Sequence, residues 1–187
     1  LMAWNDANDA PENREASIES SPCALRADVC GGDAYGVLVL YSLSKQSNMA
    51  GYRTACIAGD HTLVRAMTEL RKQIGLIVPG PVQAAMAAGL RDMAAAREQH
   101  NRYYSRLSTL VEALRAYGYD ARMPQGALYI WVRALGGDCW QDMGRLADLG
   151  IVPSPGEFYG APQYLRFSAT ASDAQIAEAA ERLHAAL

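Results

Sequence analysis

The clearest hydrophobic pattern lies in residues 37–70. Residues 37–41 form a continuous apolar run rich in β-forming side chains, typical of a strand buried on both faces of a mostly parallel sheet. Residues 54–58 predict a second short strand, which Gly59 ends. Asp60 occupies the N-cap position of a predicted helix with one apolar face. That face consists of Leu63, Val64, Met67 and Leu70.

A long helical pattern follows the Pro-Gly-Pro sequence of residues 79–81 and extends from about residue 82 to residue 117. Because most helices in globular proteins are much shorter, we expect it to bend or break once. We place a domain boundary inside this pattern, near Arg97, between residues 1–97 and 98–187. Turn-forming and charged residues dominate residues 1–30, which predicts loop with at most one short helix.

The pattern after residue 117 predicts a small α/β unit. Strands are expected at residues 127–132, 151–152 and 164–168. Two helices are expected to begin at capping boxes formed by Asp138 with Gln141 and by Ser172 with Gln175. Their apolar faces carry Trp140, Met143 and Leu146 in the first helix, and Ile176, Ala180 and Leu183 in the second. The chain as a whole therefore predicts an α/β fold.

Composition narrows the class of protein. With 187 residues, 50% hydrophobic and 20% charged, the chain fits a globular protein of one or two domains. A net charge of -3 argues against a nucleic-acid partner bound through bulk charge. No apolar run reaches the roughly 18 residues that span a bilayer, and no signal-peptide pattern is visible. We therefore expect a cytoplasmic protein without a membrane partner. The long irregular arm after Leu1 predicts a fragment that lacks an N-terminal part.

The cysteines and histidines predict no metal site. The four cysteines form no Cys-x-x-Cys pair, and the three histidines lie far apart in the sequence. This spacing differs from that of structural zinc sites. We expect free thiols in a reducing compartment.

Lysine is rare in this chain. Only Lys45 and Lys72 are lysines among the 17 residues that are lysine or arginine. Lysine can lose its proton and attack a carbonyl, whereas arginine cannot, so a retained lysine is a candidate nucleophile. Codon bias also explains the count, and the composition alone leaves both explanations open.

The polar segment around Lys45 carries the candidate chemistry. It follows a predicted buried strand, and ligands in open α/β sheets bind beyond the carboxyl ends of strands. Ser42 and Ser44 can turn both hydroxyls toward one anion, and Arg53 can return to it with a bidentate guanidinium. Such a site suits a phosphate-bearing aldehyde cofactor with which the Lys45 amine forms a Schiff base. On spacing alone, a solvated turn with a surface lysine and a locally paired arginine remains the alternative.

The sequence Ser-Leu-Ser-Lys, with an arginine eight residues after the lysine, resembles the lysine motif of fold-type I pyridoxal phosphate-dependent aminotransferases. Residues 78–86 resemble the start of that family's long interdomain helix, and residues 126–131 resemble its small-domain strand. Residues 155–168 resemble its segment that binds the substrate carboxylate. The set is particularly similar to the actinobacterial succinyldiaminopimelate aminotransferases of lysine biosynthesis, and it covers the chain from about Asp28 onward.

The resemblance implies a role for each matching residue. Lys45 would form the Schiff base with pyridoxal 5'-phosphate and then move a proton between the substrate α-carbon and the cofactor. Ser42, Ser44 and Arg53 would bind the cofactor phosphate. Arg166 would bind the substrate α-carboxylate, the alternative being an arginine that extends from its strand into solvent.

The resemblance also implies an architecture. Residues 1–97 would be the remnant of the large, cofactor-binding domain, and residues 98–187 the C-terminal α/β small domain of fold type I. The intact enzyme would be a homodimer that uses an amino acid and a 2-oxo acid. Because the remaining cofactor contacts would lie upstream of Leu1, we expect no turnover by the chain alone.

Other functions compete with this interpretation. The chain could be a non-catalytic fragment that folds around its C-terminal part and associates with itself through exposed apolar surface. It could also be another lysine Schiff-base enzyme such as an aldolase, although Ser42, Ser44, Arg53 and Arg166 favour pyridoxal phosphate. The expected substrates are succinyldiaminopimelate, glutamate and 2-oxoglutarate, but relatives with the same motif accept other amino acids.

Aromatic residues near these motifs are less informative. Tyr129 and Trp131 alternate with Ile130 along a predicted strand, which is more typical of core packing than of ligand stacking. Phe158 and Tyr159 follow a Pro-Gly turn. There they either line a substrate pocket or pack against the fold, and the sequence leaves both open.

Overall fold

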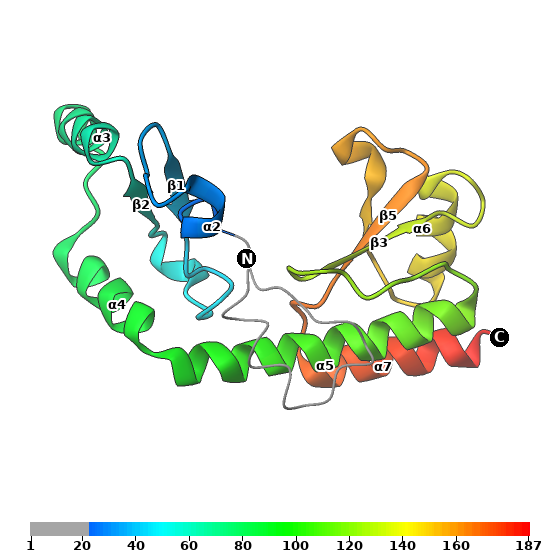
Figure 1. Ribbon diagram of the computed structural model, residues 1–187. Helices are drawn as coiled ribbons and strands as arrows, with labels where there is room; N and C mark the ends of the chain where they lie inside the picture. The colour runs from blue at the N-terminus through cyan, green and yellow to red at the C-terminus, as the bar shows by residue number, and fades with distance from the viewer. Residues whose placement is uncertain (1–22) are drawn as a thin grey trace. The chain divides into compact units, whose positions relative to one another are not determined.

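The computed structural model describes residues 23–187, which form two compact units, residues 23–100 and residues 101–187 (Figure 1). Most of the predicted irregular segment 1–30 lies outside the described residues. Its last part forms a short helix, α2 (Ala27–Cys30). Within residues 23–187, no helix has both the length and the apolar character needed to cross a membrane.

The first unit contains a two-stranded sheet followed by helices. Its elements are β1 (Leu38–Tyr41), the 3-10 turn η2 (Ala50–Tyr52), β2 (Cys56–Gly59), α3 (His61–Gln73) and α4 (Gly80–Arg91). A further helix, α5 (Met93–Tyr117), begins in this unit and ends in the second. Both predicted strands are confirmed, the second beginning two residues later than expected.

β1 and β2 pair antiparallel, from Leu38 opposite Gly59 to Tyr41 opposite Cys56. The prediction that β1 lies in a parallel sheet is therefore wrong for the one strand that the structure pairs with it. The connection 42–55 contains only the short turn η2 and no crossover helix, so the chain returns along β1 in the opposite direction. Burial on both faces of β1 is also wrong, because Leu40 is 76% exposed among the described residues.

The predicted N-cap of α3 is confirmed. The Asp60 carboxylate accepts hydrogen bonds from the backbone N–H of Thr62 at 2.8 Å and of Leu63 at 3.3 Å. It also accepts one from the Gly36 N–H at 2.8 Å. These hydrogen bonds, of which the one from Gly36 has the largest effect, hold the pKa of Asp60 below its usual value. The cap therefore joins α3 to the chain that leads into β1.

The expected break in the long helical pattern is confirmed, and it lies at Asp92, between α4 and α5. The Asp92 side chain accepts a hydrogen bond from the Ala95 N–H at 3.0 Å, as a residue at a helix N-terminus does. The apolar pattern does not mark the break, because the stretch is rich in alanine. The break is marked by Asp92, whose short side chain can cap the next helix.

The second unit combines a three-stranded antiparallel sheet with helices. After α5 its elements are β3 (Tyr129–Arg133), α6 (Cys139–Asp148), β4 (Ser154–Pro155), the 3-10 turn η3 (Gly156–Tyr159), β5 (Tyr164–Ser168) and α7 (Asp173–Ala185). The strand order is β3-β5-β4. The predicted strand at 164–168 is confirmed, whereas the one at 151–152 is wrong. The strand is Ser154–Pro155 instead, where the chain meets β5.

Side chains alternate strictly between the two faces of this sheet. Ile130 and Val132 of β3 and Leu165 and Phe167 of β5 are buried in the core against α5, α6 and α7. The intervening residues face the other side of the sheet. That second face carries Arg166, opposite Trp131 of β3 and Ser154 of β4.

The helix caps of the second unit follow the sequence patterns in part, because at α6 the structure describes only the Asp138 side of the expected capping box. Asp138 accepts hydrogen bonds from the backbone N–H of Trp140 and Gln141, and the capping box of Ser172 with Gln175 is complete. The predicted inward residues of α7 are buried. On α6, Leu146 is buried but Trp140 is exposed, because its indole N–H donates to Glu157 of η3 at the surface.

One fully buried carboxylate stabilises the second unit. The Asp142 side chain, 0% exposed, accepts hydrogen bonds from the backbone N–H of Leu135 at 2.6 Å and of Gly136 at 3.2 Å. It also accepts one from the Tyr119 hydroxyl at 3.0 Å and pairs with Arg145. Burial raises the pKa of Asp142, but Arg145 and the N–H donors outweigh it, so that the pKa lies below its usual value. Burial of Tyr119 and its hydrogen bond to the Asp142 carboxylate raise the pKa of Tyr119.

Replacing this carboxylate should destabilise the second unit. A carboxyl group whose pKa is lowered by folding contributes stability above its unfolded pKa, and that stability is lost as the pH falls through its folded pKa. We expect Asp142→Asn to lower the free energy of unfolding by about 2–4 kcal/mol at pH 7 and to flatten the loss of stability below about pH 4. Urea denaturation across pH measures both effects.

The matched control is Asp120→Asn, which breaks the exposed ion pair between Asp120 and Arg122. It should cost less than about 1 kcal/mol. Equal costs for the two variants would contradict a stabilising role for the buried Asp142 cluster.

Candidate functional site

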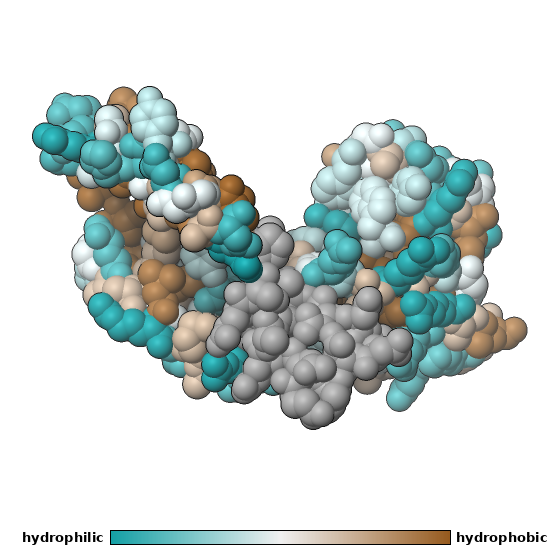
Figure 2. Space-filling view, in the orientation of Figure 1, coloured by the Kyte–Doolittle hydropathy of each residue, from teal (hydrophilic) through white to brown (hydrophobic). Residues whose placement is uncertain are grey.

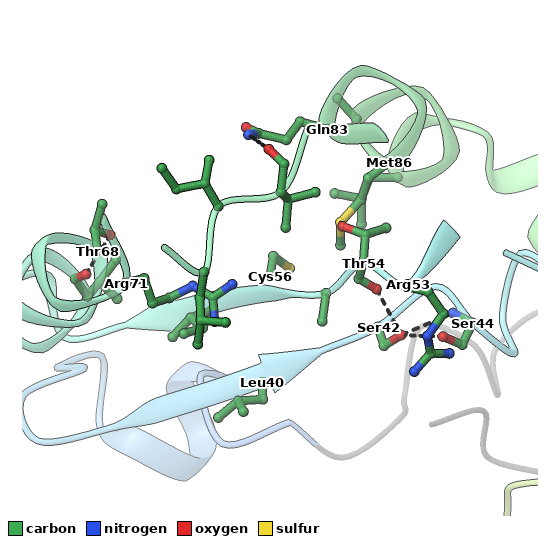
Figure 3. A pocket seen from close by; sticks show the side chains of 18 of the residues that line it. Leu40, Ser42, Ser44, Arg53, Thr54, Cys56, Thr68, Arg71, Gln83 and Met86 are labelled. Carbon is green, nitrogen blue, oxygen red and sulfur yellow. Dashed lines mark hydrogen bonds between the residues drawn. The ribbon is translucent and has the colours of Figure 1, made fainter. Parts of the chain in front are cut away.

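The polar residues after β1 form a hydrogen-bonded cluster. The hydroxyl oxygens of Ser42 and Ser44 lie 2.8 Å apart, and the Ser44 N–H donates to the Ser42 hydroxyl at 3.2 Å. The Ser42 hydroxyl also donates to the Thr54 carbonyl at 3.3 Å, which joins the beginning of the connection 42–55 to its end (Figure 3). The two hydroxyls therefore lie close enough to contact the same anion.

Arg53 returns to this cluster. Its backbone is left-handed, with φ of 50°, at the C-terminus of η2, and its guanidinium donates to the Ala50 carbonyl at 3.0 Å. Figure 3 shows the Arg53 side chain beside Ser42 and Ser44 at one end of a cavity. The Arg53 side chain is exposed and has one hydrogen bond to the described residues, so it retains N–H donors for an anion.

Lys45 lies in the exposed turn of the same connection. The Ser47 and Met49 N–H groups both donate to the carbonyl of Leu43, whose side chain is 0% exposed. Leu43 therefore fixes the turn from inside while Lys45 projects from it. Tyr41, whose hydroxyl donates to the Gln46 side chain, holds the turn from the end of β1. Burial raises the pKa of Tyr41.

Helix α4 supports the connection. The Thr54 hydroxyl, which is buried, donates to the sulfur of Met86 at 3.3 Å. Gly89, one helical turn further, lies against Leu43 and Met49. A Cβ atom at this position would stand 3.0 Å from Leu43 Cδ1 and 2.9 Å from Met49 Sδ. A glycine at position 89 therefore allows the helix to approach the turn closely.

The cavity beside this cluster has a volume of about 700 Å³ and lies within the first unit. Ser42, Ser44 and Arg53 line one end, and Thr68 and Arg71 of α3 line the other (Figure 3). Apolar side chains of β2, α4 and the segment between α3 and α4 form its walls, and Figure 2 shows them along this hollow. Lys45 is not among the lining residues.

Arg166 occupies the exposed face of the sheet in the second unit and is half-buried. Its guanidinium carbon lies 4.2 Å from the ring centre of Tyr129 and 4.7 Å from that of Tyr159. Its Nη2 donates to the Ser154 hydroxyl at 3.4 Å. The Arg166 guanidinium therefore lies over the faces of two aromatic rings and is not simply extended into solvent.

The structure brings some of the predicted site residues together. Ser42, Ser44 and Arg53 meet at one cavity, and Lys45 lies on the same connection. Arg166 belongs to the other unit. No set of three or more histidine, cysteine, aspartate and glutamate side chains in the described part of the chain is arranged to hold a metal ion. All four cysteines are free thiols.

Several neighbours of the site were not predicted from the sequence. Thr54 and Met86 support Ser42, but the patterns that contain them, the predicted strand 54–58 and the segment 78–86, give neither residue a role at the site. The alternation of Tyr129 with Ile130 favours core packing, but it also places Tyr129 on the face that carries Arg166. The interaction of Tyr159 with Arg166 depends on the path of the turn η3, which the local sequence pattern does not reveal.

Comparison with known proteins identifies the family. The sequence model described as Aminotransferase class I and II matches residues 4–183. The chain therefore belongs to the class I and II aminotransferases. Enzymes of this family depend on pyridoxal 5'-phosphate, as expected from the lysine motif.

Individual relatives are similar over most of this chain. The 4-dedimethylamino-4-oxo-anhydrotetracycline transaminase OxyQ of Streptomyces rimosus is 45% identical over 98% of the chain and 53% of its own length. An LL-diaminopimelate aminotransferase of Nitratidesulfovibrio vulgaris is 32% identical over 92% of the chain and 43% of its own length. A solved structure, a probable N-succinyldiaminopimelate aminotransferase of Thermus thermophilus, is 26% identical with a TM-score of 0.67, covering 83% of this chain and 43% of that one. The chain thus spans about half the length of the relatives it matches, or less.

The residues of the first unit fit pyridoxal phosphate. Two adjacent hydroxyls and a guanidinium are suitable donors for a phosphate dianion, and a primary amine on the same connection is the group that an aldehyde requires. Buried Leu43 and the support from α4 restrict the movement of these residues.

Removing the Arg53 guanidinium should reduce selectivity for the phosphate. We expect Arg53→Ala to lower the preference of the Lys45 amine for pyridoxal phosphate over pyridoxal by about tenfold or more, because a charge-assisted hydrogen bond to phosphate is lost. Absorbance titration with each aldehyde measures the ratio. Arg65→Ala removes an exposed arginine of α3 outside the cavity and should leave the ratio unchanged. An unchanged ratio in Arg53→Ala would exclude Arg53 as a phosphate ligand.

Proposed function

We propose that this chain provides the lysine, the phosphate-binding residues and the carboxylate-binding arginine of a pyridoxal phosphate-dependent aminotransferase. The enzyme transfers an amino group from an amino acid to a 2-oxo acid. The observation that supports this most directly is the cluster of Ser42, Ser44 and Arg53 on the same connection as Lys45. Membership of the aminotransferase family supports it independently.

The residues of the first unit would divide the work as follows. Ser42, Ser44 and Arg53 hold the cofactor phosphate and so fix the distance of its aldehyde from Lys45. When bound, pyridoxal phosphate withdraws electrons from the substrate α-carbon and thereby weakens the bond to its proton. Lys45 would receive that proton at Nζ and hold it for transfer. Lys45 lies on a turn that buried Leu43 anchors, so its amine would need to move only a short way to transfer the proton.

Arg166 would bind the α-carboxylate of the amino acid. A planar guanidinium with two parallel N–H donors matches a carboxylate in both charge and geometry. The same interaction suits the 2-oxo acid, which carries the same carboxylate. One arginine therefore serves both half-reactions.

The working enzyme would be a longer polypeptide and a homodimer. The relatives are about twice as long as this chain or more, and the other cofactor contacts of the family would come from sequence outside residues 1–187. We therefore expect the chain alone to bind the cofactor but not to turn over an amino acid and a 2-oxo acid. The second candidate function, a non-catalytic piece that associates with itself, is favoured by the exposed apolar residue Leu40 on β1.

Labelling of the two lysines tests the proposal. The chain is incubated with pyridoxal phosphate, reduced with borohydride, digested and examined by mass spectrometry. We expect saturable labelling of Lys45 and only slow labelling of Lys72. Both side chains are exposed, so exposure alone does not favour either one. Lys45→Ala should abolish the saturable part.

Lys72 requires its own control because its amine pairs with Glu69 at 3.1 Å. Glu69→Gln removes that partner. If Lys72 remains slow in this variant, the selectivity for Lys45 comes from its surroundings. Equal slow labelling of both lysines would contradict the proposed cofactor site and favour the non-catalytic function.

The finer proposal is that the amino-group pair includes succinyldiaminopimelate and 2-oxoglutarate. The names of the Thermus thermophilus and Nitratidesulfovibrio vulgaris proteins support a diaminopimelate-type substrate, whereas OxyQ is named for a tetracycline intermediate. In a catalytically competent protein that carries this chain, kcat/KM for succinyldiaminopimelate should exceed that for aspartate. Equal or better use of aspartate in steady-state kinetics would overturn the assignment.

A further inference from the structure

The aromatic surroundings of Arg166 are built by the sheet itself. Trp131 lies directly opposite Arg166 on β3, and Tyr129 stands two residues away on the same face. Diagonal neighbours across antiparallel strands are within reach of long and aromatic side chains. This register brings the Tyr129 ring to 4.2 Å from the guanidinium carbon.

Tyr159 reaches Arg166 from a different element, the turn η3. This turn packs tightly on the start of β5, because a Cβ atom on Gly156 would lie 2.2 Å from the Ala161 carbonyl oxygen and 2.4 Å from that of Tyr164. Only glycine fits there without movement of the backbone. The close approach fixes where η3 carries Tyr159, whose ring lies 4.7 Å from the guanidinium carbon.

Further ring contacts hold Tyr159 in place from outside. Its ring packs edge-on against the Trp131 ring, with 5.8 Å between the ring centres. Trp131 in turn stacks on Tyr164, with 5.4 Å between the ring centres. Tyr159 is 49% exposed, so core packing does not explain its position. Its contacts to Trp131 and Arg166 explain it.

These contacts restrict the guanidinium in a particular way. A cation near the faces of two rings is attracted to both, and the two attractions together restrict its position. Nη2 has the Ser154 hydroxyl as partner, whereas the buried Nε has no partner among the described residues. The rings thus hold the charge without using its N–H donors.

We propose that Tyr129 and Tyr159 are positioning residues of the carboxylate site: their two ring faces hold the Arg166 guanidinium in the orientation that binds a carboxylate. The inference rests on the proposed function of Arg166. Because the rings order the side chain before the ligand arrives, binding does not have to supply that ordering. The hydroxyl groups of the two tyrosines take no part.

Nitrogen-15 spectra of the arginine side chains test this on the whole chain without cofactor. The Arg166 Nε–H signal, identified by its loss in Arg166→Lys, is followed during titration with 2-oxoglutarate. We expect a saturable shift, and dissociation constants about fivefold larger in Tyr129→Leu and Tyr159→Leu. Tyr129→Phe and Tyr159→Phe keep the ring faces and should bind within twofold of the unaltered chain.

The matched control is Phe158→Leu. Phe158 is 69% exposed on the same turn as Tyr159 but contacts Trp140, so this variant should bind 2-oxoglutarate normally. Tyr159 lies at the surface, and its leucine variant alone decides the question if Tyr129→Leu fails to fold.

Three results would overturn the inference: leucine variants that bind as tightly as the unaltered chain, phenylalanine variants as weak as the leucine ones, or no shift of the Arg166 signal at all. The labelling of Lys45 is measured separately and involves no carboxylate. Selective labelling of Lys45 without carboxylate binding would therefore support the proposed cofactor site and contradict the inference about the carboxylate site.

Discussion

In both units, buried apolar side chains fix the orientation of polar neighbours in the sequence. Leu43 points into the first unit between Ser42 and Ser44, so the two hydroxyls must share the opposite side. In the second unit Leu165 and Phe167 enter the core on either side of Arg166. Successive side chains of an extended chain point to opposite sides, so a shift of one residue would exchange core and site. The hydrophobic core thus determines which residues can contact a ligand.

Much of the fold follows from local patterns in the sequence. The caps at Asp60 and Ser172 and the strand β5 are where the sequence predicts them, because side-chain oxygens and period-two alternation act within a few residues. The antiparallel partner of β1 and the position of β4 depend on which strands meet in space. The helix break at Asp92 depends on a single carboxylate in a stretch without apolar period.

The same distinction applies to the site. Ser42, Ser44, Lys45 and Arg53 are close in sequence, so one motif indicates all four, and the structure brings the three anion-binding candidates to one cavity. The residues that support them come from elsewhere. Met86 and Gly89 belong to α4, and Tyr159 reaches Arg166 only through the docking of η3. Such contacts are set by tertiary packing, and no spacing within the sequence encodes them.

The turn η3 has an evolutionary consequence. Phe158 and Tyr159 are adjacent, yet Phe158 contacts Trp140 and Tyr159 contacts Arg166. Under the proposed role of Arg166, the carboxylate site constrains Tyr159, whereas Phe158 contacts no residue of that site. Descendants of this chain can diversify their preferences through neighbouring surface positions without rebuilding the part of the fold that holds Arg166.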